Sequence, residues 1–138
     1  MRIAVVDGQG GGIGRHIVEK IRREFPEDIE ILALGTNALA TSVMLKAGAN
    51  EGATGENAVI INAGRVDLIL GPVSIVFPNA MLGEMTPAMA TAISASQAGK
   101  ILIPLTRSGV DIVGVKSEPL PHMIEEMVAR LREIMGKR

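Results

Sequence analysis

A cluster of glycines near the start of the chain has a spacing that suits the binding of a phosphate group. After the apolar run of residues 2–6, the chain continues as Asp7-Gly8-Gln9-Gly10-Gly11-Gly12-Ile13-Gly14. Glycine permits a tight turn and, lacking a Cβ atom, lets an anion approach the backbone. A helix that follows such a turn presents unpaired N–H groups and the positive end of its dipole. We therefore expect these eight residues to bind a small phosphate-bearing ligand.

A second group of candidate binding residues follows the next expected strand, residues 29–34. It consists of Gly35, Thr36 and Asn37. Ligands of open α/β sheets bind beyond the carboxyl ends of the strands, so this group and the glycine loop should share one rim. Proteins that bind NAD carry an acidic residue at this position for a ribose hydroxyl. If a dinucleotide binds here, Thr36 and Asn37 would be its adenosine-side contacts, with Arg15 as a phosphate partner.

Other residues near the rim offer chemistry of different kinds. A carboxylate alone can act as a general base. The candidates for that role are Asp7, Glu51 and Glu84. The segment Thr106-Arg107-Ser108 fits either an anion contact or a solvated turn. The chain has no tyrosine and no cysteine, and we find no pairing of its two histidines with an acid. No conventional catalytic set is therefore visible, no metal site is expected, and enzymatic activity stays an open question.

The pattern along the chain predicts one domain over residues 1–138. Short apolar runs predict strands at residues 2–6, 29–34, 67–70, 100–103 and 111–115, the last beside residues 100–103 or at an edge. Helical periodicity predicts one helix that ends before Pro26 and another that starts near Pro121. Helices are also expected over residues 37–47 and, after the start signal Thr86-Pro87, over residues 87–97. Residues 56–63 fit a helix and a strand equally well, residues 73–76 are expected to be extended, and residues 48–55 form a second glycine-rich loop that could cover the rim.

This alternation of strands and helices predicts an α/β fold with three layers. We expect a Rossmann-like, doubly wound and mostly parallel sheet of about five strands. The strand order stays open at this point, because a flavodoxin-like arrangement obeys the same loop rule.

Composition excludes several classes of partner. The 14 basic and 15 acidic residues nearly balance, and no block of like charge predicts binding to nucleic acid or to an anionic membrane. No apolar run approaches the roughly 20 residues that span a bilayer. Residues 1–7 fit a strand rather than a signal peptide, and the absence of cysteine fits the cytoplasm. With no tyrosine or tryptophan, a nucleobase cannot stack on either of these side chains.

Two resemblances follow from these motifs. The spacing of Gly8, Gly12 and Gly14 resembles the cofactor loop of short-chain dehydrogenase/reductases, as does the run Asn62-Ala63-Gly64. That resemblance implies NAD(P) or another nucleotide as cofactor, although the catalytic tyrosine of that family is impossible here. Over its whole length the chain resembles a family of short bacterial Rossmann-like proteins known only as a domain of unknown function. The stretches that carry this resemblance are residues 5–14, 46–57 and 83–87.

Three hypotheses about function remain. The first is a nucleotide-binding or dinucleotide-binding protein without a conventional catalytic set. The second is a small enzyme, an oxidoreductase or transferase, that uses a carboxylate at the rim. The third is a structural or partner-binding protein whose glycines only allow close packing. A homodimer is also expected as one use of an apolar patch formed by Met81, Leu82 and Met85, beside a helix rich in Ala and Ser; the alternative is that Met81 and Met85 belong to the core, as we expect for Met89.

Overall fold

Five parallel strands form the central sheet, in the order β3-β2-β1-β4-β5. The structure is a computed structural model, and it describes residues 1–105 and 109–136. In chain order the elements are β1 (Arg2–Asp7), α1 (Gly12–Glu24), β2 (Glu30–Gly35), α2 (Ala38–Ala47), β3 (Glu51–Thr54), α3 (Glu56–Ala63), β4 (Leu68–Pro72), the 3₁₀ turn η1 (Val73–Val76), α4 (Pro87–Ala95), β5 (Gly99–Ile103) and α5 (Leu120–Gly136). This strand order is that of a Rossmann fold and not of a flavodoxin-like fold.

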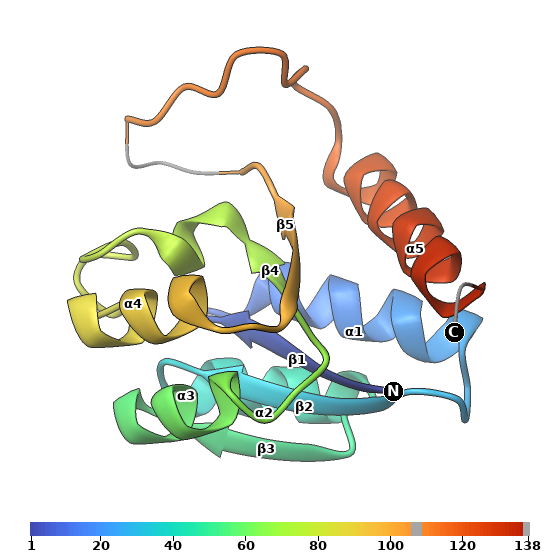
Figure 1. Ribbon diagram of the computed structural model, residues 1–138, viewed down its shortest axis with the longest axis horizontal. Coiled ribbons are helices and arrows are strands. Elements are labelled where there is room, and N and C mark those ends of the chain that lie inside the picture. Colours follow the sequence, from blue (N-terminus) through green and yellow to red (C-terminus); the bar gives the residue numbers. More distant parts are fainter. Residues whose placement is uncertain (106–108, 137–138) are drawn as a thin grey trace.

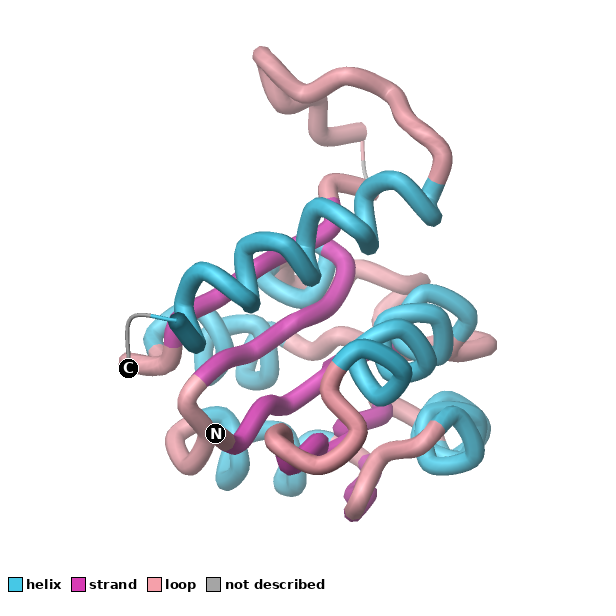
Figure 2. Tube along the Cα trace, turned by 90° about the vertical axis from the view of Figure 1, so that its right-hand side faces the viewer, coloured by secondary structure: helices cyan, strands magenta, loops and turns pink. Residues whose placement is uncertain are grey.

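Two separate cores cover the two faces of the sheet, which gives the three layers visible in Figures 1 and 2. Side chains of α1 and α5, with Met44 of α2, pack on one face. Side chains of α3 and α4 pack on the other face, together with Ile75 and Met85 of the segment between β4 and α4. Alternate residues of each central strand enter alternate cores, as Ile3 and Val5 of β1 face α1 while Ala4 and Val6 face α3 and α4.

The positions of the strands agree with the predictions for four of the five. The fifth prediction was wrong: in the described residues no strand includes 111–115, and the fifth strand is β3, within the expected glycine-rich loop 48–55. Strand β3 is short and largely exposed at the sheet edge, so it has no apolar run to reveal it. Residues 109–119 instead extend away from the body of the molecule (Figure 1).

Three further segments either differ from the predicted structure or settle a choice that the sequence left open. Residues 56–63 form helix α3, which resolves the open choice. Residues 73–76 form the 3₁₀ turn η1 rather than extended chain. Helix α4 ends at Ala95, two residues earlier than predicted, while its start is as expected, because the hydroxyl of Thr86 accepts a hydrogen bond from Met89 N–H and Pro87 occupies the first turn.

None of the helices in residues 1–105 and 109–136 has the length and apolar character that crossing a bilayer requires.

Candidate functional site

The glycine loop joins β1 to α1 and contains two kinds of glycine. Gly11 and Gly14 are buried, and a Cβ atom added to either would lie 2.6 Å from Val43 Cγ2 or 2.5 Å from Met44 Sδ, respectively. These two glycines therefore allow α1 to pack against α2. Gly10 and Gly12 are exposed, and an added Cβ would meet nothing within 4 Å. Close packing does not require glycine at these two positions, so they leave backbone accessible to a ligand.

Asp7, the last residue of β1, directs its carboxylate into the loop. Its Oδ1 accepts a hydrogen bond from Gly8 N–H at 2.8 Å and its Oδ2 accepts one from Gly14 N–H at 2.7 Å. The first turn of α1 is thus capped by a side chain of the preceding strand. Asp7 is only 5% exposed. Burial raises the pKa of this carboxyl, and a smaller contribution in the same direction comes from the nearby Glu84, while the amide hydrogen bonds oppose the increase.

Glu84 reaches the same loop from the segment between β4 and α4. Its Oε1 accepts hydrogen bonds from Gln9 N–H at 2.8 Å, from the Thr36 hydroxyl at 2.7 Å and from the Asn37 side-chain amide at 2.8 Å. These donors, with the Gln9 amide first, lower the pKa of Glu84, so this carboxylate is ionised at neutral pH. Gly8 lies directly below: a Cβ on Gly8 would be 3.2 Å from Glu84 Oε1 and 2.6 Å from Met81 Sδ.

The second group of expected binding residues lies beside the loop. Strand pairing places Gly35 next to Asp7, and Thr36 N–H donates to Asp7 O at 3.0 Å. The Asn37 amide donates to Gln9 O at 2.9 Å, and its Oδ1 accepts from Ala40 N–H as the N-cap of α2. A Cβ on Gly35 would collide with Thr41, so glycine is needed there for packing. The structure therefore brings both predicted groups to one rim.

A cleft of about 830 Å³ adjoins the glycine loop at the carboxyl ends of β1 and β4. Strands β1 and β4 are adjacent in the sheet, with β2 and β3 added on the far side of β1 and β5 on the far side of β4. The cleft therefore lies at the topological switch point. Its lining combines polar and apolar side chains: Asp7, Gln9, Ile13, Pro72, Ser74, Asn79, Ala80, Met81, Leu82 and Leu105. Its volume falls within the roughly 300–1,000 Å³ usual for small-molecule sites.

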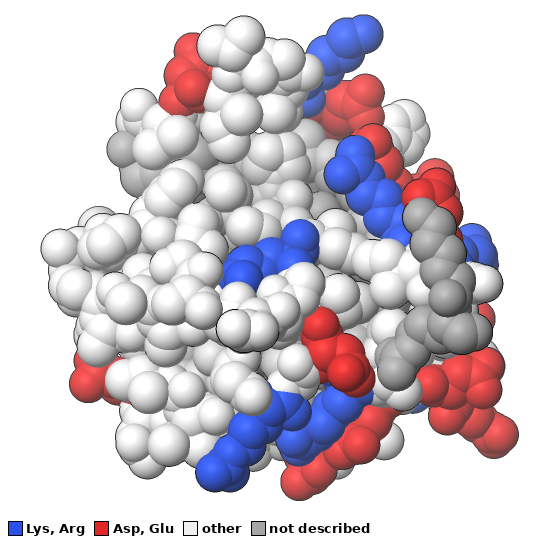
Figure 3. All heavy atoms as spheres, viewed as in Figure 1, with Lys and Arg blue, Asp and Glu red and all other residues white. Residues whose placement is uncertain are grey.

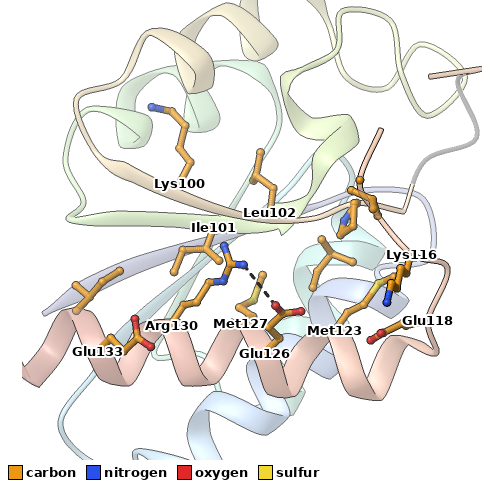
Figure 4. A pocket seen from close by; sticks show the side chains of 15 residues that line it. Lys100, Ile101, Leu102, Lys116, Glu118, Met123, Glu126, Met127, Arg130 and Glu133 are labelled. Carbon is orange, nitrogen blue, oxygen red and sulfur yellow. Dashed lines mark hydrogen bonds and ion pairs between the residues drawn. The ribbon is translucent and has the colours of Figure 1, made fainter. Parts of the chain in front are cut away.

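A second cavity of about 710 Å³ lies between β5 and α5 (Figure 4). The side chains drawn there include Met123, Met127 and an ion pair between Glu126 and Arg130. Lys100 points away from α5 and donates to the carbonyl oxygens of Ser96 and Ala98. None of its lining residues belongs to the glycine loop, and the cavity lies along the sheet edge formed by β5. The cleft at the switch point is therefore the better candidate for a ligand site.

Several predicted residues are not part of this site. Glu51 is the first residue of the edge strand β3, 3.6 Å from Arg2. It therefore lies at the amino end of its strand, and the structure does not bring it to the rim with Asp7 and Glu84. Thr106, Arg107 and Ser108 lie outside the described residues. His16 is exposed on α1, and its Nδ1 lies 3.9 Å from a carboxylate oxygen of Glu19. The expectation that no histidine pairs with an acid was therefore wrong for His16. Within the described ranges no group of three or more His, Cys, Asp or Glu side chains could hold a metal ion.

Only part of the apolar patch that the sequence suggested at Met81, Leu82 and Met85 is exposed. Met85 and Met89 are buried in the core, while Leu82 is 98% exposed and Met81 lies over Gly8. Figure 3 shows one face of the molecule, with an extensive area free of charged side chains.

Between Asp67 and Lys100 the only charged residue is Glu84. The sequence suggested Glu84 for proton transfer but contained no signal for its contact with Gln9, which is 75 positions away.

The fold defines a Rossmann-type α/β domain with a cleft at its switch point. The chain belongs to the family described as a domain of unknown function (DUF3842), whose model matches residues 2–136. Among solved structures, the chain is similar to the crystal structure of a dodecameric FMN-dependent UbiX-like decarboxylase from Escherichia coli O157:H7. The two are 14% identical with a TM-score of 0.46, over 99% of this chain and 95% of that one. The search of curated proteins finds no significant match.

Proposed function

We propose that the protein binds a nucleotide in the cleft at the switch point, with the phosphate of the nucleotide against the glycine loop. The observation that carries this proposal is the exposure of Gly10 and Gly12, which lie in the loop between Gln9 and Ile13, two residues that line a cleft of about 830 Å³. In the described part of the chain their N–H groups have no hydrogen-bond partner. Exposed amides at the start of a helix are suited to bind phosphate oxygens.

The lining of the cleft supports a ligand with one polar and one apolar part. Gln9, Ser74 and Asn79 offer hydrogen-bonding groups, while Ile13 and Leu105 offer apolar surface. No aromatic side chain is among the lining residues, so a nucleobase would be held by aliphatic contacts. NAD and NADP belong to the set of ligands to be tested, with Thr36 and Asn37 in place of the usual acidic residue at the end of β2.

The test is thermal unfolding of the purified protein with NAD, NADP, ATP, GTP, FMN or inorganic phosphate. A ligand at a hundred times its dissociation constant adds about 2.7 kcal/mol, which raises the midpoint by several degrees for a domain of this size. We expect one nucleotide to do so and Gly12→Val to remove the effect. Gly64→Val is the matched control, because Gly64 is also exposed with no atom near an added Cβ, but it ends α3. If no nucleotide raises the midpoint and the protein carries no bound molecule, the proposal is wrong, and the exposed Gly10 and Gly12 do not serve to bind a nucleotide.

One observation favours a second candidate, an enzyme that acts on the bound nucleotide. Asp7 lines the cleft, and its pKa is raised by burial. A carboxyl with a raised pKa is suited to general acid–base catalysis near neutral pH. In this case Asp7→Asn would abolish turnover and still bind the ligand. Loss of binding and turnover together would leave Asp7 with only its capping role.

A further inference from the structure

The contact between Glu84 and the glycine loop has the form of an occupied anion site. Three donors from two different loops converge on one carboxylate oxygen: Gln9 N–H, the Thr36 hydroxyl and the Asn37 amide. Hydrogen bonds to an ionised acceptor are stronger than those between neutral groups. The lowered pKa of Glu84 agrees with such a donor set.

The donors are held in place independently of Glu84. The Asn37 side chain is fixed at its other end, because its Oδ1 accepts from Ala40 N–H, and its amide nitrogen also donates to Gln9 O. The Thr36 backbone is bonded to Asp7 O at the end of β1. The amide of Gln9 belongs to the loop that Asp7 braces through Gly8. The pocket is therefore built by the fold, and Glu84 is its present occupant.

The segment that carries Glu84 has features of a displaceable occupant. Met81 and Leu82 have positive φ angles of 59° and 56°, a strained conformation for residues with bulky side chains. Leu82 at its tip is 98% exposed. Glu84 is only half-buried, and its charge raises the pKa of the nearby Asp7, so the two carboxylates repel each other. Strain and repulsion both reduce the free energy needed to release Glu84.

The segment that carries Glu84 also borders the cleft. Met81 and Glu84 both lie over Gly8, where close approach to the backbone is possible only because Gly8 has no Cβ. Met81 also forms a wall of the cleft. Movement of the segment would join the cleft to the donor pocket and give a ligand access to both.

We propose that the pocket formed by Gln9 N–H, Thr36 Oγ1 and Asn37 Nδ2 binds the anionic group of the ligand, and that Glu84 occupies this pocket while no ligand is bound. The group is a phosphate or a carboxylate, since both present oxygens to convergent donors. This inference rests on the proposed function for the identity of the whole ligand, but the pocket itself can be tested without any nucleotide.

In the test, Glu84→Ala removes the carboxylate from the pocket, and small anions are then added to the protein. Thermal midpoints are measured against inorganic phosphate and against acetate, with chloride at matched ionic strength. We expect phosphate or acetate to raise the midpoint of E84A by a few degrees in a saturable manner, with a much smaller effect on the wild type. Glu125→Ala, which removes an exposed carboxylate on α5, is the matched control. Adding Thr36→Val to E84A removes one donor and should abolish the response.

The possible results separate the anion pocket from the nucleotide-binding function proposed above. Equal effects of the anions on E84A, the E125A control and the wild type would be a general salt effect and would overturn the pocket. A response to phosphate but not acetate assigns a phosphate group, and the reverse assigns a carboxylate. If anions stabilise E84A but no nucleotide stabilises either protein, the pocket stands and the proposed function fails. If a nucleotide stabilises the wild type but binds E84A no more tightly, and anions have no effect, the pocket fails alone.

A second variant covers the case in which E84A does not fold. Glu84→Gln keeps the length of the side chain but replaces the anion with a neutral amide, which is a weaker acceptor for three donors. We expect phosphate to raise the midpoint of E84Q at a lower concentration than it needs for the wild type. Equal apparent affinity of phosphate for E84Q and the wild type would contradict the exchange.

Discussion

Asp7 Oδ2 lies 2.7 Å from the backbone nitrogen of Gly14, so a carboxylate from β1 occupies the N-terminal turn of α1. In a dinucleotide-binding Rossmann fold, a pyrophosphate takes this part of the helix. Here the side chain of the preceding strand satisfies that amide, and a ligand phosphate has to use other donors of the loop. Those donors are the amides of Gly10 and Gly12 and, once Glu84 is displaced, the donors that bind its carboxylate.

The buried carboxyl of Asp7 should give a pH-dependent contribution to stability. Its pKa is raised above the ordinary value of 3.8. The folded protein therefore holds this proton more tightly than the unfolded chain, and the stabilisation is complete below pH 3.8 and lost as the pH rises through the raised pKa. We expect the stability advantage of the wild type over Asp7→Asn to shrink as the pH rises from 4 to 7. Urea unfolding at several pH values measures it, with the exposed Asp28→Asn as control.

At neutral pH, Asp7→Asn should still destabilise the protein. An asparagine has one acceptor oxygen, so one of the amides of Gly8 and Gly14 loses its partner inside the fold. An unsatisfied buried amide costs about 1–3 kcal/mol. An unchanged midpoint in urea would mean that the cap contributes nothing to stability.

Gly14 and Gly12 should respond in opposite ways to the same substitution. In Gly14→Ala the new methyl group would lie 2.5 Å from Met44 Sδ and 2.9 Å from Asp7 Cβ. Overpacking of this kind costs about 1–3 kcal/mol. Gly12→Ala meets nothing within 4 Å and replaces glycine with a better helix former, so its free energy of unfolding should be unchanged or slightly higher. Chemical denaturation of both variants decides it, and equal losses would contradict the division of the loop into packing and open glycines.

Leu82 should be a site where substitution stabilises the protein. It adopts a φ of 56° at the tip of the segment that covers Gly8, and its side chain is 98% exposed. Asparagine tolerates this left-handed conformation better than leucine does. We expect Leu82→Asn to raise the free energy of unfolding by roughly 0.5–1 kcal/mol. A decrease would show that Leu82 makes a stabilising contact, and Leu39→Asn, at an exposed leucine on α2, controls for loss of apolar surface.

Residues 109–119 should mediate association of two copies. This segment extends away from the body (Figure 1), and its apolar residues Val110, Ile112, Val113 and Val115 are exposed, Val113 to 99%. Exposed apolar groups gathered in one segment indicate a protein contact surface. We expect the wild type to sediment as an oligomer and Val113→Asp to reduce its mass. The matched substitution Leu82→Asp should leave the mass unchanged, and a monomeric wild type at high concentration would refute the expectation.

The sequence alone determined most of the fold. Continuous apolar runs identified β1, β2 and β4, because the inner strands of a parallel sheet are buried on both faces. An apolar run also identified β5, although this edge strand is only partly buried. The pair Thr86-Pro87 marked the start of α4, and helical periodicity indicated α1 and α5. The same rules missed β3, a short exposed edge strand, and placed a strand at residues 111–115, where β-branched residues occur without a partner strand in the described chain.

The position of the glycine loop and its neighbourhood with Thr36 and Asn37 also followed from the sequence, since the carboxyl ends of parallel strands share one edge of the sheet. What only the tertiary structure decided is the occupant of that loop. The burial of Asp7 depends on the close approach of α1, and the contact of Glu84 with Gln9 joins residues 75 positions apart. Such a contact leaves no periodic or local signal, because it depends on how the segment between β4 and α4 folds back over the sheet edge.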